Sequence, residues 1–125
     1  MAPSILIVDD ERLLVRTLSA ALRDAGFHTV TAASAELAEK YLDPDAAIAV
    51  AVLDNRLPGR SGLDILRDAR ARGLQWRVVL MTAFDSAEVQ QLAHELGVDR
   101  YVHKPFDLPD MVSAIAALYG AGDPA

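Results

Sequence analysis

The stretch Ser4-Ile5-Leu6-Ile7-Val8-Asp9-Asp10-Glu11 joins an uninterrupted apolar run to three consecutive acidic residues. A short apolar run without alternation is typical of a strand covered on both faces, as in a parallel sheet. Acidic side chains are favourable in the first turn of a helix, so a helix is expected to follow directly. This stretch therefore predicts a strand, an acidic loop and a helix, which is the first unit of an α/β fold.

The same order of signals recurs along the 125 residues. Further strands are predicted at 27–31, 48–53, 77–81 and 99–103, and helices at 12–25, 34–42, 61–72, 85–96 and 107–119. Ser34 is expected to cap the second helix, Ser61 and Asp64 to form a capping box for the third, and Asp85 to begin the fourth. Together they predict a doubly wound, five-stranded parallel sheet of order 2-1-3-4-5 flanked by five helices. One domain is expected over 1–120, with 121–125 as a tail or the start of a linker.

Composition excludes several classes of protein. The chain carries 18 acidic and 12 basic residues, a formal net charge of −6, which argues against direct binding of nucleic acid. It has no cysteine, so disulfides and thiolate chemistry are absent. The sequence offers neither a membrane-spanning run nor a basic signal region, so a cytoplasmic location without membrane association is expected.

Residues capable of chemistry follow four of the predicted strands: Asp9 and Asp10, Asp54, Thr82, and Lys104. In an open parallel sheet the carboxyl ends of the strands meet at one edge, so these side chains are expected to converge. Three carboxylates together repel one another unless a cation lies among them, and oxygen ligands suit Mg²⁺. An anion on Asp54 would then meet metal, ammonium and hydroxyl, the combination that stabilises phosphoryl transfer.

These residues resemble the receiver domains of bacterial response regulators, the signalling proteins of two-component systems. The resemblance extends from Ile5 to about Tyr119 and rests on Val8-Asp9-Asp10-Glu11, Asp54 with Leu57-Pro58-Gly59 and Ser61-Gly62, Met81-Thr82-Ala83, and Tyr101-Val102-His103-Lys104-Pro105-Phe106. It implies the flavodoxin-like receiver fold. It also implies a phosphorylation-controlled switch that is not a conventional enzyme and catalyses only its own phosphorylation and dephosphorylation.

The resemblance implies a role for each matching residue. Asp54 would accept a phosphoryl group from a sensor histidine kinase or a histidine phosphotransfer protein. Mg²⁺ would be held by four groups: Asp9, Asp10, Asp54 and the main-chain carbonyl of Arg56. The phosphate would be held by Lys104, Thr82 and the main-chain amides of Asn55 and Ala83. Thr82 and Tyr101 would form the switch, and the Lys104–Pro105 peptide bond is expected to be cis.

The resemblance also implies how the signal leaves the domain and how long it lasts. The output face is expected to comprise the fourth helix, fifth strand and fifth helix, through which the chain would control an output partner or domain and form a homodimer. In this family the positions of Arg56 and Phe84 flank the path of the hydrolytic water. A long cation and a bulky ring there predict slow loss of the phosphoryl group.

Other functions fit the sequence less well. A phosphatase with an aspartate nucleophile of the dehalogenase-like class needs a second acid two residues later, where this chain has Arg56. A flavodoxin-like cofactor binder needs a loop rich in Ser, Thr or Gly after the first strand, where this chain is acidic. A pseudo-receiver, a constitutive protein-binding module, is disfavoured by the intact set Asp9, Asp10, Asp54, Thr82 and Lys104, but stays an alternative.

Overall fold

A single parallel sheet forms the centre of the molecule. The computed structural model describes residues 3–84 and 86–121. The strands are β1 (Ser4–Val8), β2 (His28–Ala32), β3 (Ile48–Asp54), β4 (Arg77–Thr82) and β5 (Arg100–His103). They lie in the order β2-β1-β3-β4-β5, and all the pairs are parallel. This confirms the predicted fold and strand order.

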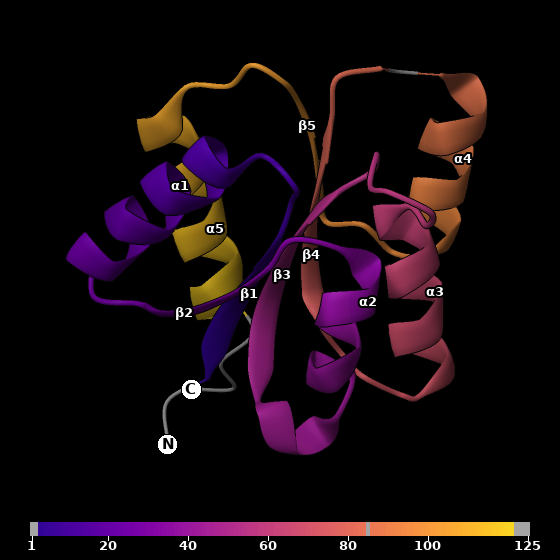
Figure 1. Cartoon of the computed structure of the whole chain (residues 1–125), viewed down its shortest axis with the longest axis horizontal. Helices are drawn as coiled ribbons and strands as arrows, with labels where there is room; N and C mark the ends of the chain where they lie inside the picture. Colours follow the sequence, from indigo (N-terminus) through magenta and orange to yellow (C-terminus); the bar gives the residue numbers. More distant parts are fainter. Residues whose placement is uncertain (1–2, 85, 122–125) are drawn as a thin grey trace.

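Helices cover both faces of the sheet (Figure 1). On one face lie α1 (Arg12–Asp24) and α5 (Leu108–Ala121), and on the other lie α2 (Ala35–Ala38), α3 (Gly62–Ala71) and α4 (Ala87–Glu95). Two 3₁₀ turns, η1 (Glu39–Tyr41) and η2 (Pro44–Ala46), connect α2 to β3. Over 3–84 and 86–121, no helix combines the length and the apolar character needed to cross a bilayer.

Several helix boundaries differ from those predicted. The helix predicted at 34–42 is capped by Ser34 as expected, but it changes to 3₁₀ geometry at Glu39. Pro44 disfavours helical geometry at Asp43, which is extended, so the preceding turn tightens and ends.

Ser86 caps α4 by accepting a hydrogen bond from the Val89 N–H, while the predicted start at Asp85 lies outside the described residues. α5 reaches Ala121, and the remaining predicted tail, 122–125, also lies outside them.

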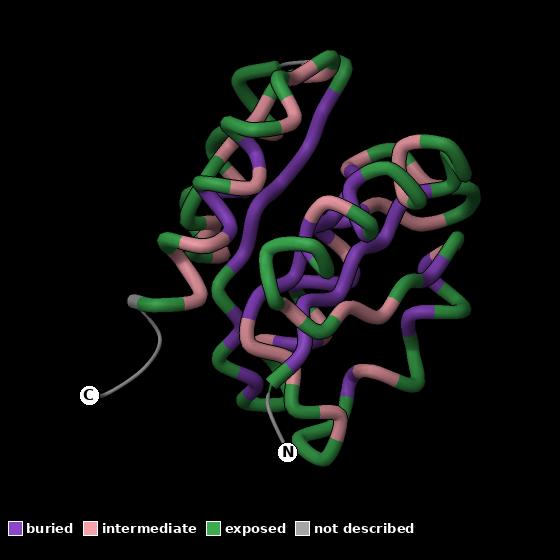
Figure 2. Tube along the Cα trace, turned by 90° about the vertical axis from the view of Figure 1, so that its left-hand side faces the viewer, coloured by how far each residue is buried: buried purple, intermediate pink, exposed green. Residues whose placement is uncertain are grey.

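Alternate residues of the strands build two cores, one on each face of the sheet. Leu6, Val8, Ala51, Leu53, Val78 and Leu80 belong to the core beneath α2, α3 and α4. Ile5, Ile7, Val50, Val52, Val79 and Met81 belong to the core beneath α1 and α5. Figure 2 shows this burial continuing along the strands. Because both faces are covered, the strands read as continuous apolar runs, as the sequence indicates.

The switch point of the sheet lies between β1 and β3. The chain passes from β1 to β2 on one side and then returns to β3 on the other side of β1. Val8 is paired with Leu53, so the next residues, Asp9 and Asp54, emerge next to one another. Open α/β sheets bind ligands at this kind of position, outside the carboxyl ends of the strands.

α3 begins directly against the end of β3. Ser61 and Asp64 form the predicted capping box, which fixes the first turn of the helix. Gly62, the first residue of that turn, is buried against the backbone of Asp54. A Cβ atom at position 62 would lie 2.4 Å from the main-chain oxygen of Asp54, closer than any real carbon contact. Glycine is therefore required there for reasons of space.

Arg70 connects the end of α3 to the end of α4, a role that its sequence context does not predict. Its guanidinium donates hydrogen bonds to four main-chain oxygens, those of Leu74, Trp76, Leu96 and Gly97. The two latter oxygens belong to the C-terminal end of α4, where unpaired carbonyls need donors. Arg67, on the same helix, is exposed.

Gly62→Ala is expected to destabilise the fold, because the new methyl group must displace either α3 or the end of β3. Overpacking of this kind costs about 1–3 kcal/mol. The matched control is Gly120→Ala, since Gly120 is helical and has open space around it; that change is expected to be neutral or to stabilise by less than ~1 kcal/mol. Urea unfolding measures both. Equal free energies of unfolding for the two variants would contradict the packing argument.

Candidate functional site

Lys104 is the centre of the site at the carboxyl ends of the strands. Its Nζ donates to Asp9 Oδ2 at 2.7 Å, to Glu11 Oε1 at 2.9 Å and to Asp54 Oδ2 at 3.2 Å. The Lys104 side chain is only 10% exposed, and those of Asp9 and Asp54 are 0% and 6% exposed. The structure therefore brings together three of the predicted residues from the ends of β1, β3 and β5.

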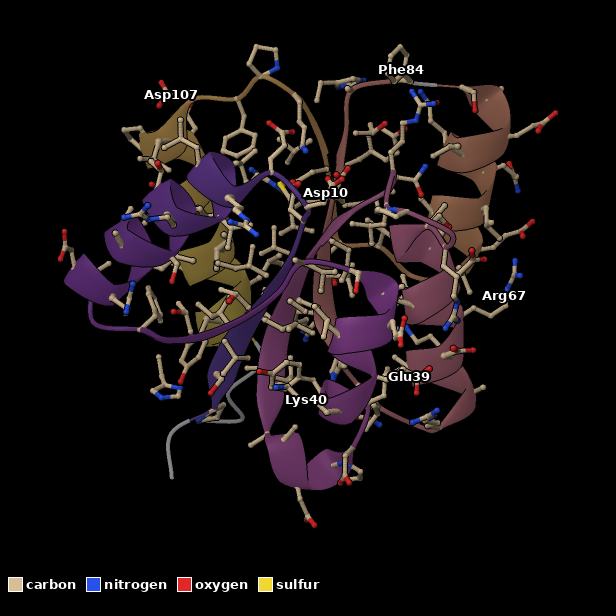
Figure 3. The ribbon with its side chains drawn as sticks, viewed as in Figure 1. Asp10, Glu39, Lys40, Arg67, Phe84 and Asp107 are labelled. Atoms are coloured by element: carbon tan, nitrogen blue, oxygen red, sulfur yellow. The ribbon has the colours of Figure 1, made fainter. Side chains whose placement is uncertain are left out.

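Asp10 completes a cluster of three carboxylates. One oxygen each of Asp9, Asp10 and Asp54 lies within 4.8 Å of the others, a spacing that suits a shared metal ion. Asp9 and Asp54 are buried, whereas Asp10 is exposed. Figure 3 places Asp10 at the same end of the sheet as Phe84, in the loop that follows β1. Hard oxygen ligands with one open side match the preference of Mg²⁺, which retains several waters.

The negative charges of the carboxylates in the cluster outnumber the single positive charge of Lys104. Burial raises the pKa of Asp54, and the charge of Asp9 raises it further; the Arg56 N–H and the Lys104 ammonium lower it, but the pKa stays above its ordinary value. Burial alone lowers the pKa of Lys104, yet the hydrogen bonds that its ammonium donates to Asp9 and Glu11, with the charges of Asp9 and Asp54, outweigh burial, so that pKa is raised. Lys104 is thus a permanent cation among carboxylates that it only partly neutralises.

Thr82 reaches the same edge at the end of β4, and its side chain is fully buried. Its hydroxyl donates to the main-chain oxygen of Phe84 at 2.6 Å and accepts from the Phe84 N–H at 3.1 Å. The ring of Phe84, which is 63% exposed, lies 4.4 Å from the guanidinium of Arg56. Thr82 is therefore bonded to the loop after β4.

Two main-chain amides near Asp54 already donate hydrogen bonds within the domain. The Asn55 N–H, predicted as a phosphate donor, donates to Met81 O at 2.9 Å in this structure, as part of the contact between β3 and β4. The Arg56 N–H instead donates to Asp54 Oδ1 at 3.2 Å. Residue spacing alone does not reveal which amide N–H is hydrogen-bonded within the sheet. Asn55 Oδ1 is buried without a hydrogen-bond partner among the described residues.

Other predicted site residues lie nearby. The Lys104–Pro105 peptide bond is cis, as expected, and the Lys104 N–H donates to Thr82 O at 2.8 Å. Tyr101 packs on the core beneath α3 and α4 and meets the ring of His103 edge-on, with 5.5 Å between the ring centres. Ala83 is exposed in the loop after β4. Glu11, which accepts a hydrogen bond from Lys104, was not among the predicted site residues, although its place in the loop after β1, two residues beyond Asp9, indicates that it could reach the site.

Comparison with known families agrees with this geometry. The family model described as "Response regulator receiver domain" matches residues 5–116. The chain therefore belongs to the response regulator receiver domains of two-component signalling systems.

Several curated proteins are similar over nearly the whole chain. The "Probable transcriptional regulatory protein TcrX" of Mycobacterium tuberculosis is 39% identical over 118 residues, covering 92% of this chain and 49% of that protein. The "Response regulator protein PmrA" of Pseudomonas aeruginosa is 39% identical over 114 residues, covering 91% of this chain and 51% of that protein. This chain spans about half the length of the curated relatives it matches.

Solved structures show the same fold. The non-phosphorylated HemR receiver domain of Leptospira biflexa superposes with a TM-score of 0.89 at 27% identity, covering 98% of both chains. A CheY-like receiver domain protein of Methanospirillum hungatei gives a TM-score of 0.90 at 23% identity, covering 98% of this chain and 97% of that one.

Asp54→Asn is expected to stabilise the metal-free protein at about pH 7. Since folding raises the pKa of Asp54, the folded state holds its proton more tightly, and stability is lost as pH rises from the ordinary aspartate range of about 4 through that raised pKa. The gain in melting temperature from Asp54→Asn should therefore shrink as the pH is lowered. Thermal unfolding in a metal chelator at several pH values measures it, and a less stable variant at pH 7 would contradict this electrostatic account.

Proposed function

We propose that Asp54 is the phosphoacceptor of this receiver domain. The observation that carries the proposal is the contact of Lys104 Nζ with the buried carboxylates of Asp9 and Asp54 at the switch point. A carboxylate oxygen of Asp54 attacks phosphorus and forms an acyl phosphate. The bond from phosphorus to the donor breaks and its electron pair leaves with the donor, which is an imidazole nitrogen when the donor is phosphohistidine.

The acidic cluster would hold Mg²⁺ through Asp9, Asp10 and Asp54, with the main-chain carbonyl of Arg56 as the proposed further ligand. The bound ion would offset the charge that develops on the transferring phosphoryl group. Lys104 lies within hydrogen-bond distance of Asp54 Oδ2, so its ammonium is positioned to pair with a phosphate oxygen. The Arg56 N–H, already directed at Asp54 Oδ1, is positioned for another.

Thr82 and the main-chain N–H of Ala83 supply the remaining donors in this proposal. Donation from Thr82 to the phosphate would break its bond to Phe84 O and alter the loop after β4. Tyr101 lies in the neighbouring strand, where it would respond to that movement. The signal would pass to the face formed by α4, β5 and α5, and from there to an output partner or domain, or to a second copy of the chain.

The donor in the cell would be a sensor histidine kinase or a histidine phosphotransfer protein, as the family suggests. Phosphorylation of Asp54 would need no substrate other than the phosphodonor. The domain would then act as a timed switch and not as a conventional enzyme.

Incubation with Mg²⁺ and acetyl phosphate is expected to add one phosphoryl group per chain, detected by intact mass. Asp54→Ala and omission of Mg²⁺ should each abolish the adduct. Asp45→Ala is the matched control, since Asp45 is exposed and lies before β3, at the opposite end of that strand from Asp54, and the variant should be phosphorylated normally. Absence of an adduct with every phosphodonor would favour the pseudo-receiver alternative.

The lifetime of the phosphoryl group is expected to depend on Arg56 and Phe84, whose side chains meet beside the site. Replacing both with alanine should open the approach of water and speed phosphate loss about two- to tenfold, at most ~1.4 kcal/mol of activation free energy. The decay of phosphorylated protein after removal of the donor measures this. An unchanged or slower decay in the double variant would disprove the shielding role.

A further inference from the structure

The hydroxyl proton of Thr82 is already donated to the loop after β4 in this structure. A hydroxyl has one proton to donate, and Thr82 donates it to Phe84 O at 2.6 Å while accepting from Phe84 N–H at 3.1 Å. The same proton cannot at the same time be donated to a phosphate oxygen. The arrangement seen here and the phosphate-bound arrangement are therefore mutually exclusive, and whatever fixes Phe84 influences the balance between them.

The side chain of Phe84 is fixed by Arg56. Burial does not hold this ring in place, because it is 63% exposed. The guanidinium of Arg56 lies over it at 4.4 Å from the ring centre, well within cation–π distance. Arg56 is itself fixed at its other end, where its main-chain N–H donates to Asp54 Oδ1 at 3.2 Å. The loops after β3 and β4 are thus joined by a side-chain contact that lies outside the core.

We infer that the stack of Arg56 on Phe84 is a latch that holds the hydroxyl of Thr82 on the main chain of Phe84 in the unphosphorylated protein. The two residues are positioning residues, since they act on Thr82 and not on the phosphoryl group. This inference rests on the proposed role of Thr82 as a phosphate donor. It concerns the equilibrium before phosphorylation and is separate from the shielding of the acyl phosphate from water.

The expected size of the effect follows from the exposure of the stack. Cation–π contacts at exposed sites change an equilibrium by about two- to fivefold. Loss of the contact between Arg56 and Phe84 should therefore raise the population of protein in which the Thr82 hydroxyl is free of Phe84 by about two- to fivefold. A phosphoryl mimic that needs Thr82 should then bind more tightly by the same factor, because the competent state is more populated.

The test uses the full chain with Phe84→Leu, which removes the ring but keeps apolar bulk, and Arg56→Met, which removes the cation but keeps length. Phe84→Tyr is the matched control because it keeps the ring. Hydrogen exchange of the residue 84 amide in the unphosphorylated protein should speed up about two- to fivefold in Phe84→Leu and in Arg56→Met. The double variant should show no further increase, since both changes remove one interaction. Phe84→Tyr should exchange like wild type.

Affinity for beryllofluoride in the presence of Mg²⁺, measured by titration, should rise by the same factor in the two single variants. Unchanged exchange at residue 84 in both variants, or fully additive effects in the double variant, would overturn the latch. Unchanged exchange of the β4 amides verifies that each variant is folded. Failure of wild type to bind beryllofluoride would count against the proposed function alone, since exchange at residue 84 tests the latch without any phosphoryl group.

Discussion

The ammonium of Lys104 lies among carboxylates that have been removed from water, and this contact is the constraint on which the site depends. Burying Asp9 and Asp54 side by side is unfavourable unless a cation accompanies them. Lys104 provides one positive charge against those two and the exposed Glu11. Burial, with the charge of Asp9, keeps the pKa of Asp54 raised, and the negative charge that Lys104 leaves unneutralised favours a further cation. The local loss of stability therefore accompanies a cluster of carboxylates that could hold a metal ion.

The fold is arranged so that this contact is reached from distant parts of the sequence. β1 supplies Asp9, β3 supplies Asp54 and the end of β5 supplies Lys104, and the pairing of Val8 with Leu53 places the two carboxylates in neighbouring strands. Behind them Gly62 lets α3 start against the main chain of Asp54. The two apolar cores hold the strands in position, and the strands in turn determine where the charged groups of Asp9, Asp54 and Lys104 lie.

Sequence patterns predicted the strand order, the capping box at Ser61 and the convergence of Asp9, Asp10, Asp54 and Lys104, because each follows from local rules and from the geometry of parallel sheets. Sequence patterns do not reveal features that depend on tertiary competition for hydrogen bonds. The Asn55 N–H is taken by Met81 O in the sheet, which leaves the Arg56 N–H facing Asp54. The bonds of Arg70 to the end of α4 join residues whose contact no local pattern encodes.

The attachment of α4 by Arg70 has a mechanical consequence. The last carbonyls at the C-terminal end of the helix, those of Leu96 and Gly97, are tied to α3, while its N-terminal end follows the loop that holds Phe84. When one end of a helix is held in place, a displacement at its other end tilts the helix axis. Displacement of that loop would therefore rotate α4 about Gly97 as a lever, with the largest travel near Ser86 and almost none beside Arg70.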